Sequence, residues 1–341
     1  MNIVPLQTSD QAAWNAYVFA HADGTFFHRA EWQTIIEQAF GHRTFFVLAR
    51  RGEKICGVLP LGFVTSLLFG KALVSNPFCV YGGILADDDE VRATLHAHAS
   101  AQAKSLGASH LEYRHQQRQL PQLVTQNLYY TFRKEILPEV EANLNAIPRK
   151  QRAVVRKGID AGLHGEIDSG TERFFACYAA SVHRLGTPVF SKRYFALLKK
   201  TFGDDCEVLT ICTPEGEAVS SVLSFYFRDT VLPYYGGGSE RARDTRANDF
   251  MYWDLMRRAC ERGLKVFDYG RSKEGTGAFS FKKNWGFEPQ PLHYEFDLVN
   301  CTEIPQHNPL NPKYQLFIKL WQKLPLPVAN LLGPHIVRGL G

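Results

Sequence analysis

The feature that most constrains this chain is an internal repeat. Residues 26–64 and residues 189–227 share one predicted order of elements, which is a helix, a strand, a turn and a second strand. Gly41 and Gly203 each follow a phenylalanine where the predicted helix ends. Glycine is favoured there because it adopts the left-handed cap conformation at little cost. A repeat of this length predicts two units built on one plan.

The two halves stay in step after these strands. Each half continues with a helix, a strand and a closing strand. The paired segments are 89–107 with 248–263 for the helix, 108–114 with 264–270 for the strand, and 129–137 with 292–298 for the closing strand. This alignment sets Glu112 opposite Asp268 and Tyr113 opposite Tyr269.

The repeat predicts an α/β (α+β) fold of two similar units. Each unit should be a mixed, mostly antiparallel sheet flanked by helices. We place the first unit at residues 1–140, the second at 141–300 and a C-terminal helical tail at 301–341. The 341 residues suit two domains of about 150 residues each.

Composition narrows the functional classes. The chain has 39 Lys and Arg residues against 34 Asp and Glu residues, which gives a net charge of +5. This charge indicates a mild preference for anionic partners, but it does not indicate a DNA-binding protein. Seven scattered cysteines without a C-x-x-C pair indicate reduced thiols and a cytoplasmic location. The N-terminus lacks a signal-peptide pattern, and no apolar run is long enough to predict a membrane span.

A basic segment separates the two repeats. "LNAIPRKQRAVVRKGIDAGL", residues 144–163, predicts a helix that starts near Pro148. Arg149 and Arg152 lie on it among further basic residues. Two interpretations stay open, a solvated basic face or a site that binds phosphate or another anion.

The order of elements and several motifs resemble a known family. A helix, an antiparallel meander, a glycine-marked fourth strand, a helix and a final strand pair resemble the GNAT acyltransferase fold. Two such units in tandem resemble the FemAB family of aminoacyl and acyl transferases. "GRSKEGTGAFSFKKNWGFEPQPLHYEF", "RLGTPVFSKRYF" and "LPLPVANLLGPHIVRGLG" are similar to FemAB-like proteins associated with exosortase and PEP-CTERM systems, which occur with exopolysaccharide genes.

The resemblance implies a place for the acyl donor. GNAT folds bind the donor where the two central strands separate, and glycine lets the backbone approach a ligand closely. "YYGGGS" follows a predicted strand in the second half. We therefore expect Tyr235, Gly236, Gly237 and Gly238 to bind the donor. The alternative is a plain flexible turn.

The stretch "FDYGRSKEGTGAFSFKKNWGFEP" supplies the candidate catalytic residues. Asp268 ends a strand, so its carboxylate could orient or deprotonate the amine, with Arg271 and Ser272 beside it. An Asp–Arg pair that only fixes the next loop is the alternative. Gly275 and Gly277 would let that loop pack against a ligand. By resemblance to an F-K motif of FemAB enzymes, Lys282 would steady the donor's charge in the transition state.

Weaker candidates complete the site. His183 could act as a base, but a hydrogen-bonded structural histidine is the favoured interpretation. Trp285 is more often a core residue than a platform for a ligand. We expect no metal site, because His96 and His98 would point apart on a helix.

The C-terminal tail differs in character from the rest of the chain. An apolar stripe runs through Leu316, Phe317, Leu320, Trp321 and Leu324, and Lys313, Lys319 and Lys323 flank it. Such a helix could lie on the inner face of a membrane or cover the core of the second unit.

The leading hypothesis is an N-acyltransferase that acts on an amine in cell-envelope or exopolysaccharide biosynthesis. No cofactor would be bound permanently. The donor would be an acyl-CoA, an acyl carrier protein (ACP) thioester or an aminoacyl-tRNA, so ACP and tRNA are candidate partners. The first unit lacks the glycine loop and the F-K motif, which suggests that it binds the acceptor or stabilises the pair. The alternative is a non-catalytic binding module.

Overall fold

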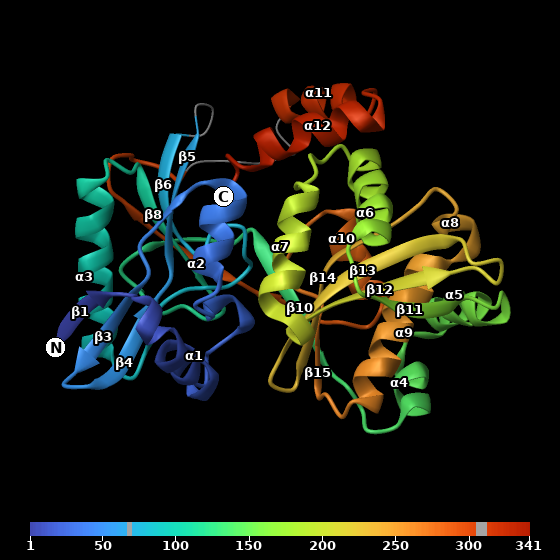
Figure 1. Ribbon diagram of the computed structural model, residues 1–341, viewed down its shortest axis with the longest axis horizontal. Helices are drawn as coiled ribbons and strands as arrows, with labels where there is room; N and C mark the ends of the chain where they lie inside the picture. Colours follow the sequence, from blue (N-terminus) through green and yellow to red (C-terminus); the bar gives the residue numbers. More distant parts are fainter. Residues whose placement is uncertain (67–69, 305–311) are drawn as a thin grey trace. The chain divides into compact units, whose positions relative to one another are not determined.

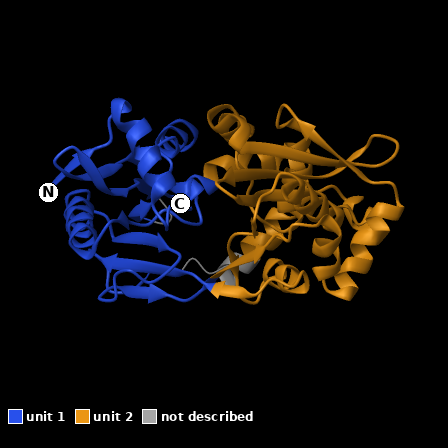
Figure 2. Cartoon of the chain, turned by 90° about the horizontal axis from the view of Figure 1, so that it is seen from below, with its two compact units in different colours: residues 1–129, 291–307, 337–341 blue, residues 130–290, 308–336 orange. Residues whose placement is uncertain are grey.

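The computed structural model describes residues 1–66, 70–304 and 312–341 (Figure 1). The chain divides into two compact units, and each of them is built from separate stretches of sequence (Figure 2). Unit 1 consists of residues 1–129, 291–307 and 337–341, and unit 2 consists of residues 130–290 and 308–336.

Unit 1 contains two sheets. The smaller has the order β1-β3-β4-β7 and the larger the order β2-β5-β6-β8-β18-β9. The strands are β1 (Asn2–Pro5), β2 (Arg43–Thr44), β3 (Val47–Arg51), β4 (Lys54–Leu59), β5 (Leu61–Ser66), β6 (Gly70–Ser75), β7 (Leu85–Ala86), β8 (His110–His115), β9 (Val124–Gln126) and β18 (His293–Leu298). The helices are α1 (Gln11–Ala20), α2 (Trp32–Ile35) and α3 (Asp89–Ser105). The pairs are antiparallel except β6 with β8, which is parallel.

Unit 2 is built on one sheet of the order β11-β12-β13-β14-β15-β10-β16, with β17 paired to β10. The strands are β10 (Tyr129–Glu135), β11 (His164–Asp168), β12 (Cys206–Cys212), β13 (Ala218–Phe227), β14 (Thr230–Gly238), β15 (Val266–Asp268), β16 (Ser272–Lys273) and β17 (Pro289–Pro291). The helices are α4 (Val140–Ala146), α5 (Arg149–Asp160), α6 (Glu172–Arg184), α7 (Lys192–Phe202), α8 (Ala242–Thr245), α9 (Ala247–Glu261), α10 (Gly277–Asn284), α11 (Pro312–Trp321) and α12 (Leu326–Val337).

The long helices form because their apolar residues recur at helical spacing. On α3, Val91, Leu95, Ala99 and Ala103 lie four residues apart and are all buried in the core of unit 1. Asp88 caps this helix by accepting a hydrogen bond from the Val91 amide. The predicted glycine at the other end is confirmed, since Gly107 has a φ of +64°.

The closing strands do not lie where the repeat places them. The sequence predicts that residues 129–137 complete the first sheet and residues 292–298 the second, and this is wrong. β10 instead pairs with β15 in unit 2, with Arg133 opposite Asp268. β18 pairs with β8 in unit 1, with Glu295 opposite Tyr113. Each sheet is therefore completed by a strand from the other half of the sequence.

A buried polar network fixes β18 in unit 1. The Ile84 amide donates to Nε2 of His115, which leaves the proton on Nδ1, and Nδ1 donates to Glu295 over 2.6 Å. The Gln119 and Leu120 amides also donate to the fully buried Glu295 carboxylate. Burial acts to raise the pKa of Glu295, but these donors outweigh it and hold the pKa below its usual range. The alternating pattern that β10 and β18 share carries no information about these partners.

The predicted domain limits change accordingly. The first unit was placed at 1–140 and the second at 141–300, but residues 130–140 belong to unit 2 and residues 291–300 to unit 1. The predicted tail, 301–341, is also divided between the units. Arg338 accepts a hydrogen bond from His42 over 2.7 Å, and Gly341 accepts one from Arg114 over 3.2 Å, so the chain end is part of unit 1.

We expect Glu295→Ala to lower the free energy of unfolding by about 3–5 kcal/mol, the range for removing one partner of a buried charged pair. The substitution leaves two amides and the His115 imidazole without their acceptor. Urea unfolding followed by circular dichroism measures the change. Glu288→Ala, at an exposed position, is the control and should change stability by less than about 0.5 kcal/mol. Equal small effects at both positions would contradict this role of β18.

Candidate active site

The two central strands of unit 2 run parallel for only a short distance. β14 pairs with β15 at Thr230 with Val266 and at Val231 with Phe267, and β14 then continues to Gly238 without β15 as a neighbour. Among the described residues, the register of β14 with β15 ends at Val231, so the rest of β14 is not paired with β15. Backbone groups that lose a strand neighbour need a hydrogen-bonding partner when they are shielded from water. This edge is therefore suited to binding a carbonyl group of a ligand.

The glycine triplet lies inside β14 and is not a turn. Gly236, Gly237 and Gly238 pair with Val222, Ser221 and Ser220 of β13. A Cβ atom on Gly237 would lie 2.7 Å from Ser181 of α6, and one on Gly238 would lie 2.6 Å from Asn248 of α9. The glycines thus let helices approach both faces of the strand, so the flexible-turn alternative is wrong.

Tyr235 faces the core. Its side chain is 8% exposed, and its hydroxyl shares a hydrogen bond of 2.9 Å with the Tyr194 hydroxyl of α7. Aromatic rings of Tyr178, Phe190 and Phe195 surround it. Direct contact between Tyr235 and a donor would require this cluster to open, so its role in the structure is packing.

Two tyrosines that the sequence analysis did not select lie beside the open edge of β14. A Cβ atom on Gly236 would lie 3.0 Å from the Tyr252 hydroxyl of α9. The ring of Tyr269, which follows β15, lies 4.9 Å from the ring of Tyr252. The Tyr269 hydroxyl is buried without a hydrogen-bond partner among the described residues. Burial is the main cause that raises the pKa of Tyr252 to about 12, so its hydroxyl stays protonated and can donate.

A carboxyl group lies one helical turn from Tyr252. Asp249 lies in the first turn of α9, and its Oδ1 accepts hydrogen bonds from Trp285 Nε1, over 3.1 Å, and from Gln151. Burial raises the pKa of Asp249, although these two donors oppose the shift. A half-buried carboxyl group with a raised pKa is a candidate for proton transfer.

Lys282 is buried beneath the loop that follows β15. Its Nζ donates to the carbonyl oxygens of Tyr269, Gly270 and Arg271 at 2.7, 3.0 and 3.2 Å. An ammonium group has three donors, and all three are used here. Burial lowers the pKa of Lys282 to about 7, against the opposing effect of the Asp268 carboxylate. The lysine thus holds the backbone that carries Tyr269.

Asp268 holds the same loop from the other side. Its Oδ1 accepts a hydrogen bond of 2.8 Å from the Gly270 amide, and Oδ2 lies 3.4 Å from Arg133 Nε of β10. The side chain is 2% exposed. Asp268, Arg271 and Lys282 therefore meet around one loop. The contacts of Asp268 correspond to the structural alternative, in which it fixes this loop, with Arg133 as a partner.

The other predicted residues of this stretch take separate places. Ser272 is buried on β16, and its hydroxyl has no partner among the described residues. Gly275 has a φ of +78°, which only glycine adopts easily, and Gly277 is the first residue of α10. Trp285 is fully buried, as expected for a core residue.

Three predicted residues lie away from the β14 edge. Arg149 is exposed at the start of α5, and Arg152 on the same helix donates to the Asn145 carbonyl over 2.6 Å. Nε2 of His183 on α6 lies 3.2 Å from the Trp321 carbonyl oxygen. His183 is thus a hydrogen-bonded structural histidine, which is the interpretation favoured from the sequence.

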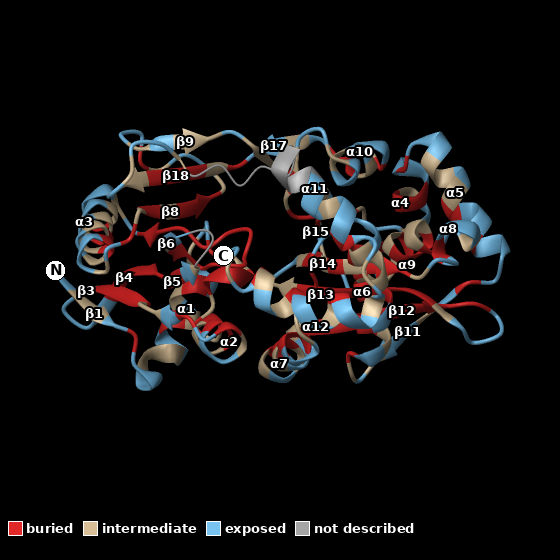
Figure 3. Cartoon of the chain, turned by 90° about the horizontal axis from the view of Figure 1, so that it is seen from above, coloured by how far each residue is buried: buried red, intermediate tan, exposed pale blue. Residues whose placement is uncertain are grey.

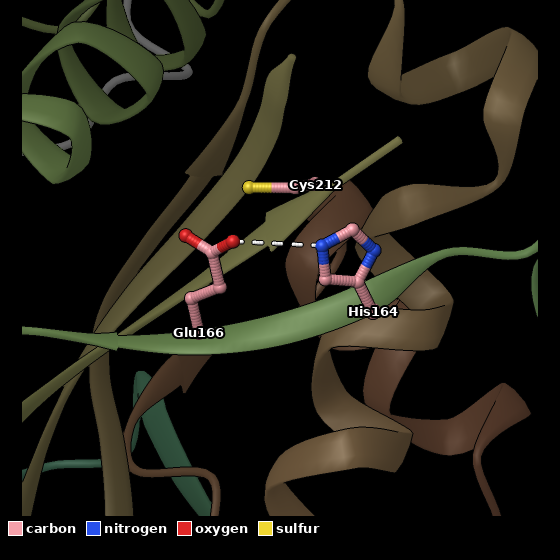
Figure 4. Close-up of side chains that lie close together, drawn as sticks. All are labelled: His164, Glu166 and Cys212. Atoms are coloured by element: carbon pink, nitrogen blue, oxygen red, sulfur yellow. Dashed lines mark ion pairs between the residues drawn. The ribbon is translucent and has the colours of Figure 1, made fainter. Parts of the chain in front are cut away.

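His164, Glu166 and Cys212 bring three potential metal ligands together on β11 and β12 (Figure 4). Their ligand atoms lie within 4.8 Å of one another. However, the Arg173 guanidinium pairs with Glu166 over 2.7 Å and lies 3.5 Å from the Cys212 sulfur. Burial raises the pKa of Cys212, which disfavours the thiolate that metals require. A cation would have to displace Arg173, so we treat the cluster as an ion-pair network.

Unit 1 repeats the strand separation but fills it with its own side chains. β6 and β8 pair in parallel up to Val74 with Glu112. The Ser75 hydroxyl then accepts the Arg114 amide, and His115 accepts the Ile84 amide, over 2.8 and 2.9 Å. Tyr113, the counterpart of Tyr269, shares a 3.0 Å hydrogen bond with His96. Beside the separation in unit 1, side chains of the same unit thus accept the Arg114 and Ile84 amides.

Unit 1 also contains a cavity of about 440 Å³. It lies between the Gly83–Ile84 segment, the start of α3 and the loop after β8. Its polar lining includes Thr25, Asp89, Arg92, Gln116, Arg118 and Gln119. A cavity of this size and polarity suits a small polar ligand. The cavity lies in unit 1, which lacks the F-K motif. The sequence analysis did not expect this unit to carry the chemistry.

We expect Lys282 to make unfolding pH-dependent in a defined direction. Its pKa is about 7 in the folded chain against 10.5 for an unperturbed lysine, so the unfolded state binds more protons between these values. Its contribution to stability should therefore rise from pH 7 to pH 10, by an order of a few kcal/mol. Urea unfolding of the wild type and of Lys282→Met at pH 7 and pH 9.5 measures it.

The neighbouring Lys283 provides the control for this measurement. It is exposed, so Lys283→Met should keep the pH dependence of the wild type. An identical pH dependence in the wild type and in Lys282→Met would contradict the burial effect.

Comparison with known proteins supports the fold described above. Residues 145–283, which lie in unit 2, match the family described as Acetyltransferase (GNAT) domain. The lipid II:glycine glycyltransferase of Staphylococcus aureus strain USA300 is 31% identical over 102 residues, which cover 28% of this chain and 24% of that protein. The chain thus matches about a quarter of the length of this curated relative.

Solved structures match over nearly the whole chain. FemX superposes with a TM-score of 0.69 at 17% identity and covers 93% of this chain and 100% of its own. A tandem GNAT protein from the clavulanic acid biosynthesis pathway superposes with a TM-score of 0.56 at 10% identity, over 89% of this chain and 99% of its own. The protein therefore has a tandem GNAT-like fold, and residues 145–283 of its second unit match the Acetyltransferase (GNAT) domain family.

Proposed function

We propose that this protein is an N-acyltransferase that moves an acyl or aminoacyl group from an activated donor to an amine. The observation that carries the proposal is the open edge of β14 in unit 2, where the Tyr252 hydroxyl lies against Gly236. The GNAT domain match covers this unit. The resemblance to the FemAB family supports the reaction class.

The reaction requires a carbonyl site and a proton acceptor. We place the donor carbonyl at the edge of β14 beyond Val231, with the Tyr252 hydroxyl donating to its oxygen. Negative charge develops on that oxygen as the amine attacks, so a fixed donor there stabilises the transition state. A new C–N bond forms, and the C–S or C–O bond of the donor breaks. The leaving sulfur or oxygen takes up a proton.

The attacking amine must first lose a proton, because it arrives mostly as an ammonium ion at neutral pH. We assign this proton to Asp249, one turn before Tyr252 on α9, whose pKa is raised by burial. Asp268, the residue selected from the sequence, is committed to the Gly270 amide. We therefore give Asp268 and Lys282 a positioning role, since together they fix the loop that carries Tyr269.

Unit 1 binds the acceptor in this proposal. Its strand separation holds the His115 and Ser75 side chains, which already accept the Ile84 and Arg114 amides. Its polar cavity can hold part of a polar molecule. Glu112, the counterpart of Asp268, is bound to Arg114 over 2.7 Å and has no part in the chemistry.

The donor is an acyl-CoA, an acyl carrier protein thioester or an aminoacyl-tRNA. The acceptor is an amine from cell-envelope or exopolysaccharide biosynthesis, in line with the resemblance to the proteins associated with PEP-CTERM and exosortase systems. A curated relative transfers glycine to lipid II according to its name, which favours an envelope precursor as the acceptor. We place the reaction in the cytoplasm, with peripheral contact to the inner face of a membrane. Arg149 and Arg152 on α5 are candidates for binding phosphates of the donor.

A non-catalytic binding module is the second candidate. The filled strand separation of unit 1 is one observation in its favour, because half of the tandem fold has already lost an open donor edge. The two candidates differ in what the β14 edge does when a donor is present.

Transfer can be tested directly with a defined set of donors. The protein is incubated with acetyl-CoA, a long-chain acyl-CoA, an acyl carrier protein thioester or glycyl-tRNA, together with a fraction of soluble envelope precursors. Mass spectrometry then detects an acceptor whose mass increases by the acyl group. We expect transfer from at least one donor. Binding of precursors without transfer from any of these donors would favour the binding module.

The role of Tyr252 gives a sharper test. We expect Tyr252→Phe to lower kcat by about 10²-fold, the effect of losing one hydrogen-bond donor to a developing oxyanion, with little change in KM. Tyr178→Phe is the matched control, because it removes a tyrosine hydroxyl from α6, which packs on the opposite face of β14. Wild-type kcat in Tyr252→Phe would remove this residue from the mechanism.

A further inference from the structure

An apolar surface is exposed on the two C-terminal helices. We define the apolar hairpin face as the exposed large residues of α11 and α12, which are Leu316, Phe317, Leu320, Val328, Leu331 and Leu332. Leu316 and Leu331 are 62% and 69% exposed. Six of the thirteen exposed large hydrophobic residues in the described part of the chain thus lie within one short segment (Figure 3). A concentration of this kind marks an interaction surface.

The opposite side of the same helices is firmly packed on unit 2. Trp321 and Ala329 are 3% and 2% exposed. A Cβ atom on Gly333 would lie 2.9 Å from the Val189 backbone, and one on Gly186 would lie 2.4 Å from Ile318. Side chains of His183 and Gln322 add hydrogen bonds of 3.2 and 2.7 Å between α6 and α11. The hairpin is therefore held in one orientation, and the exposure of its outer face follows from the fold.

The residue sizes on α12 are the reverse of those of an ordinary surface helix. Ala329 and Gly333, four residues apart, face the protein, whereas Val328, Leu331 and Leu332 face outward. A surface helix normally buries its large apolar residues and exposes polar ones. The predicted stripe is thus divided, because Trp321 covers the core while Leu316, Phe317 and Leu320 do not. The inner face therefore covers unit 2, which is one of the two roles considered for the tail, and the outer face is exposed.

The charged side chains of the C-terminal segment are all basic. No acidic residue follows Glu303 in the sequence, whereas Lys313, Lys319, Lys323 and Arg338 do. Lys319 and Lys323 are exposed next to the apolar hairpin face. The side chain of Lys313 lies outside the described residues. Basic residues beside an apolar helix face are typical of a segment that lies in the interface of an anionic bilayer.

We propose that the apolar hairpin face docks on the surface of an anionic lipid bilayer. The leucine and phenylalanine side chains would enter the boundary between headgroups and acyl chains, and Lys319 and Lys323 would contact the anionic headgroups. A spanning arrangement is not part of the proposal, since every helix among the described residues is too short or too polar to cross a bilayer. The inference does not depend on the proposed transferase activity.

Vesicle co-sedimentation of the full chain tests the docking. The vesicles contain phosphatidylcholine alone or phosphatidylcholine with about a third of phosphatidylglycerol. We expect the protein to bind the anionic vesicles at least about tenfold better than the neutral ones, and binding should weaken as salt is raised. Equal binding to both compositions, or binding to neither, would overturn the proposal.

Variants then locate the surface. Leu331→Gln with Leu332→Gln should lower vesicle binding by about tenfold or more, and Lys319→Glu with Lys323→Glu should abolish the preference for anionic vesicles. Phe19→Gln with Ile159→Gln changes exposed apolar residues elsewhere and should leave binding unchanged. Circular dichroism melting confirms that all variants fold. Wild-type binding in the Leu331 and Leu332 variant would overturn the assignment of the face.

A second copy of the chain is the competing occupant, and light scattering distinguishes it. If the wild type is a dimer in solution and the Leu331 and Leu332 variant is a monomer, the face is a dimer interface and the bilayer proposal fails. A monomeric wild type that binds anionic vesicles supports it.

Discussion

The chemistry proposed for this protein depends on one geometric constraint, the separation of β14 from β15 after two parallel residue pairs. Every backbone group of a buried strand needs a partner, and a strand that loses its neighbour must find one elsewhere. In unit 1 the equivalent need is met by the Ser75 hydroxyl and the His115 imidazole. In unit 2, the Tyr252 hydroxyl lies over β14 at Gly236, where a Cβ atom would lie 3.0 Å from it. The two units thus differ most where a ligand carbonyl would bind.

The loop after β15 follows the strand that separates from β14, and its backbone is held in place by side chains. Lys282 donates to three successive carbonyl oxygens, and Asp268 accepts the Gly270 amide, so the loop is fixed from two directions. The arrangement also depends on β10, because Arg133 of that strand lies opposite Asp268. Since β10 follows unit 1 in the sequence, the loop of one unit is supported by a strand that the repeat assigns to the other. A substitution in β10 can therefore disturb the candidate site, although β10 supplies none of its proposed catalytic residues.

Much of the fold could be predicted from the sequence, because its signals are local. Gly41, Gly107 and Gly263, which end segments predicted as helices, all have positive φ values. The strands at Glu112 and Asp268 occupy equivalent parallel positions in the two sheets. The exchange of β10 and β18 could not be predicted, because both strands carry the same alternating pattern and their partners lie far away in sequence. Glu295, whose buried partners His115 and Leu120 precede it by about 180 residues, illustrates the difficulty.

The candidate site was predicted less completely, for a related reason. Asp268, Arg271 and Lys282 are adjacent to one loop in sequence, and the structure keeps them together. Most of their hydrogen bonds, however, are made with the backbone, which a sequence does not show. Tyr252 and Asp249 lie on the helix predicted for residues 248–263, which the sequence analysis treated only as a structural element. Their spacing of three residues at the start of the helix after the glycine strand was the available signal.

Hydrogen exchange with mass spectrometry tests the central claim most directly, because it reports which backbone amides a donor protects. The protein is measured with and without a non-hydrolysable thioether analogue of an acyl-CoA or a stable analogue of an aminoacyl-adenosine. The account predicts new protection in peptides that cover residues 232–240 and 269–272 of unit 2, and none in the peptide that covers residues 81–85 of unit 1. Protection at residues 81–85 without any at residues 232–240 would contradict it.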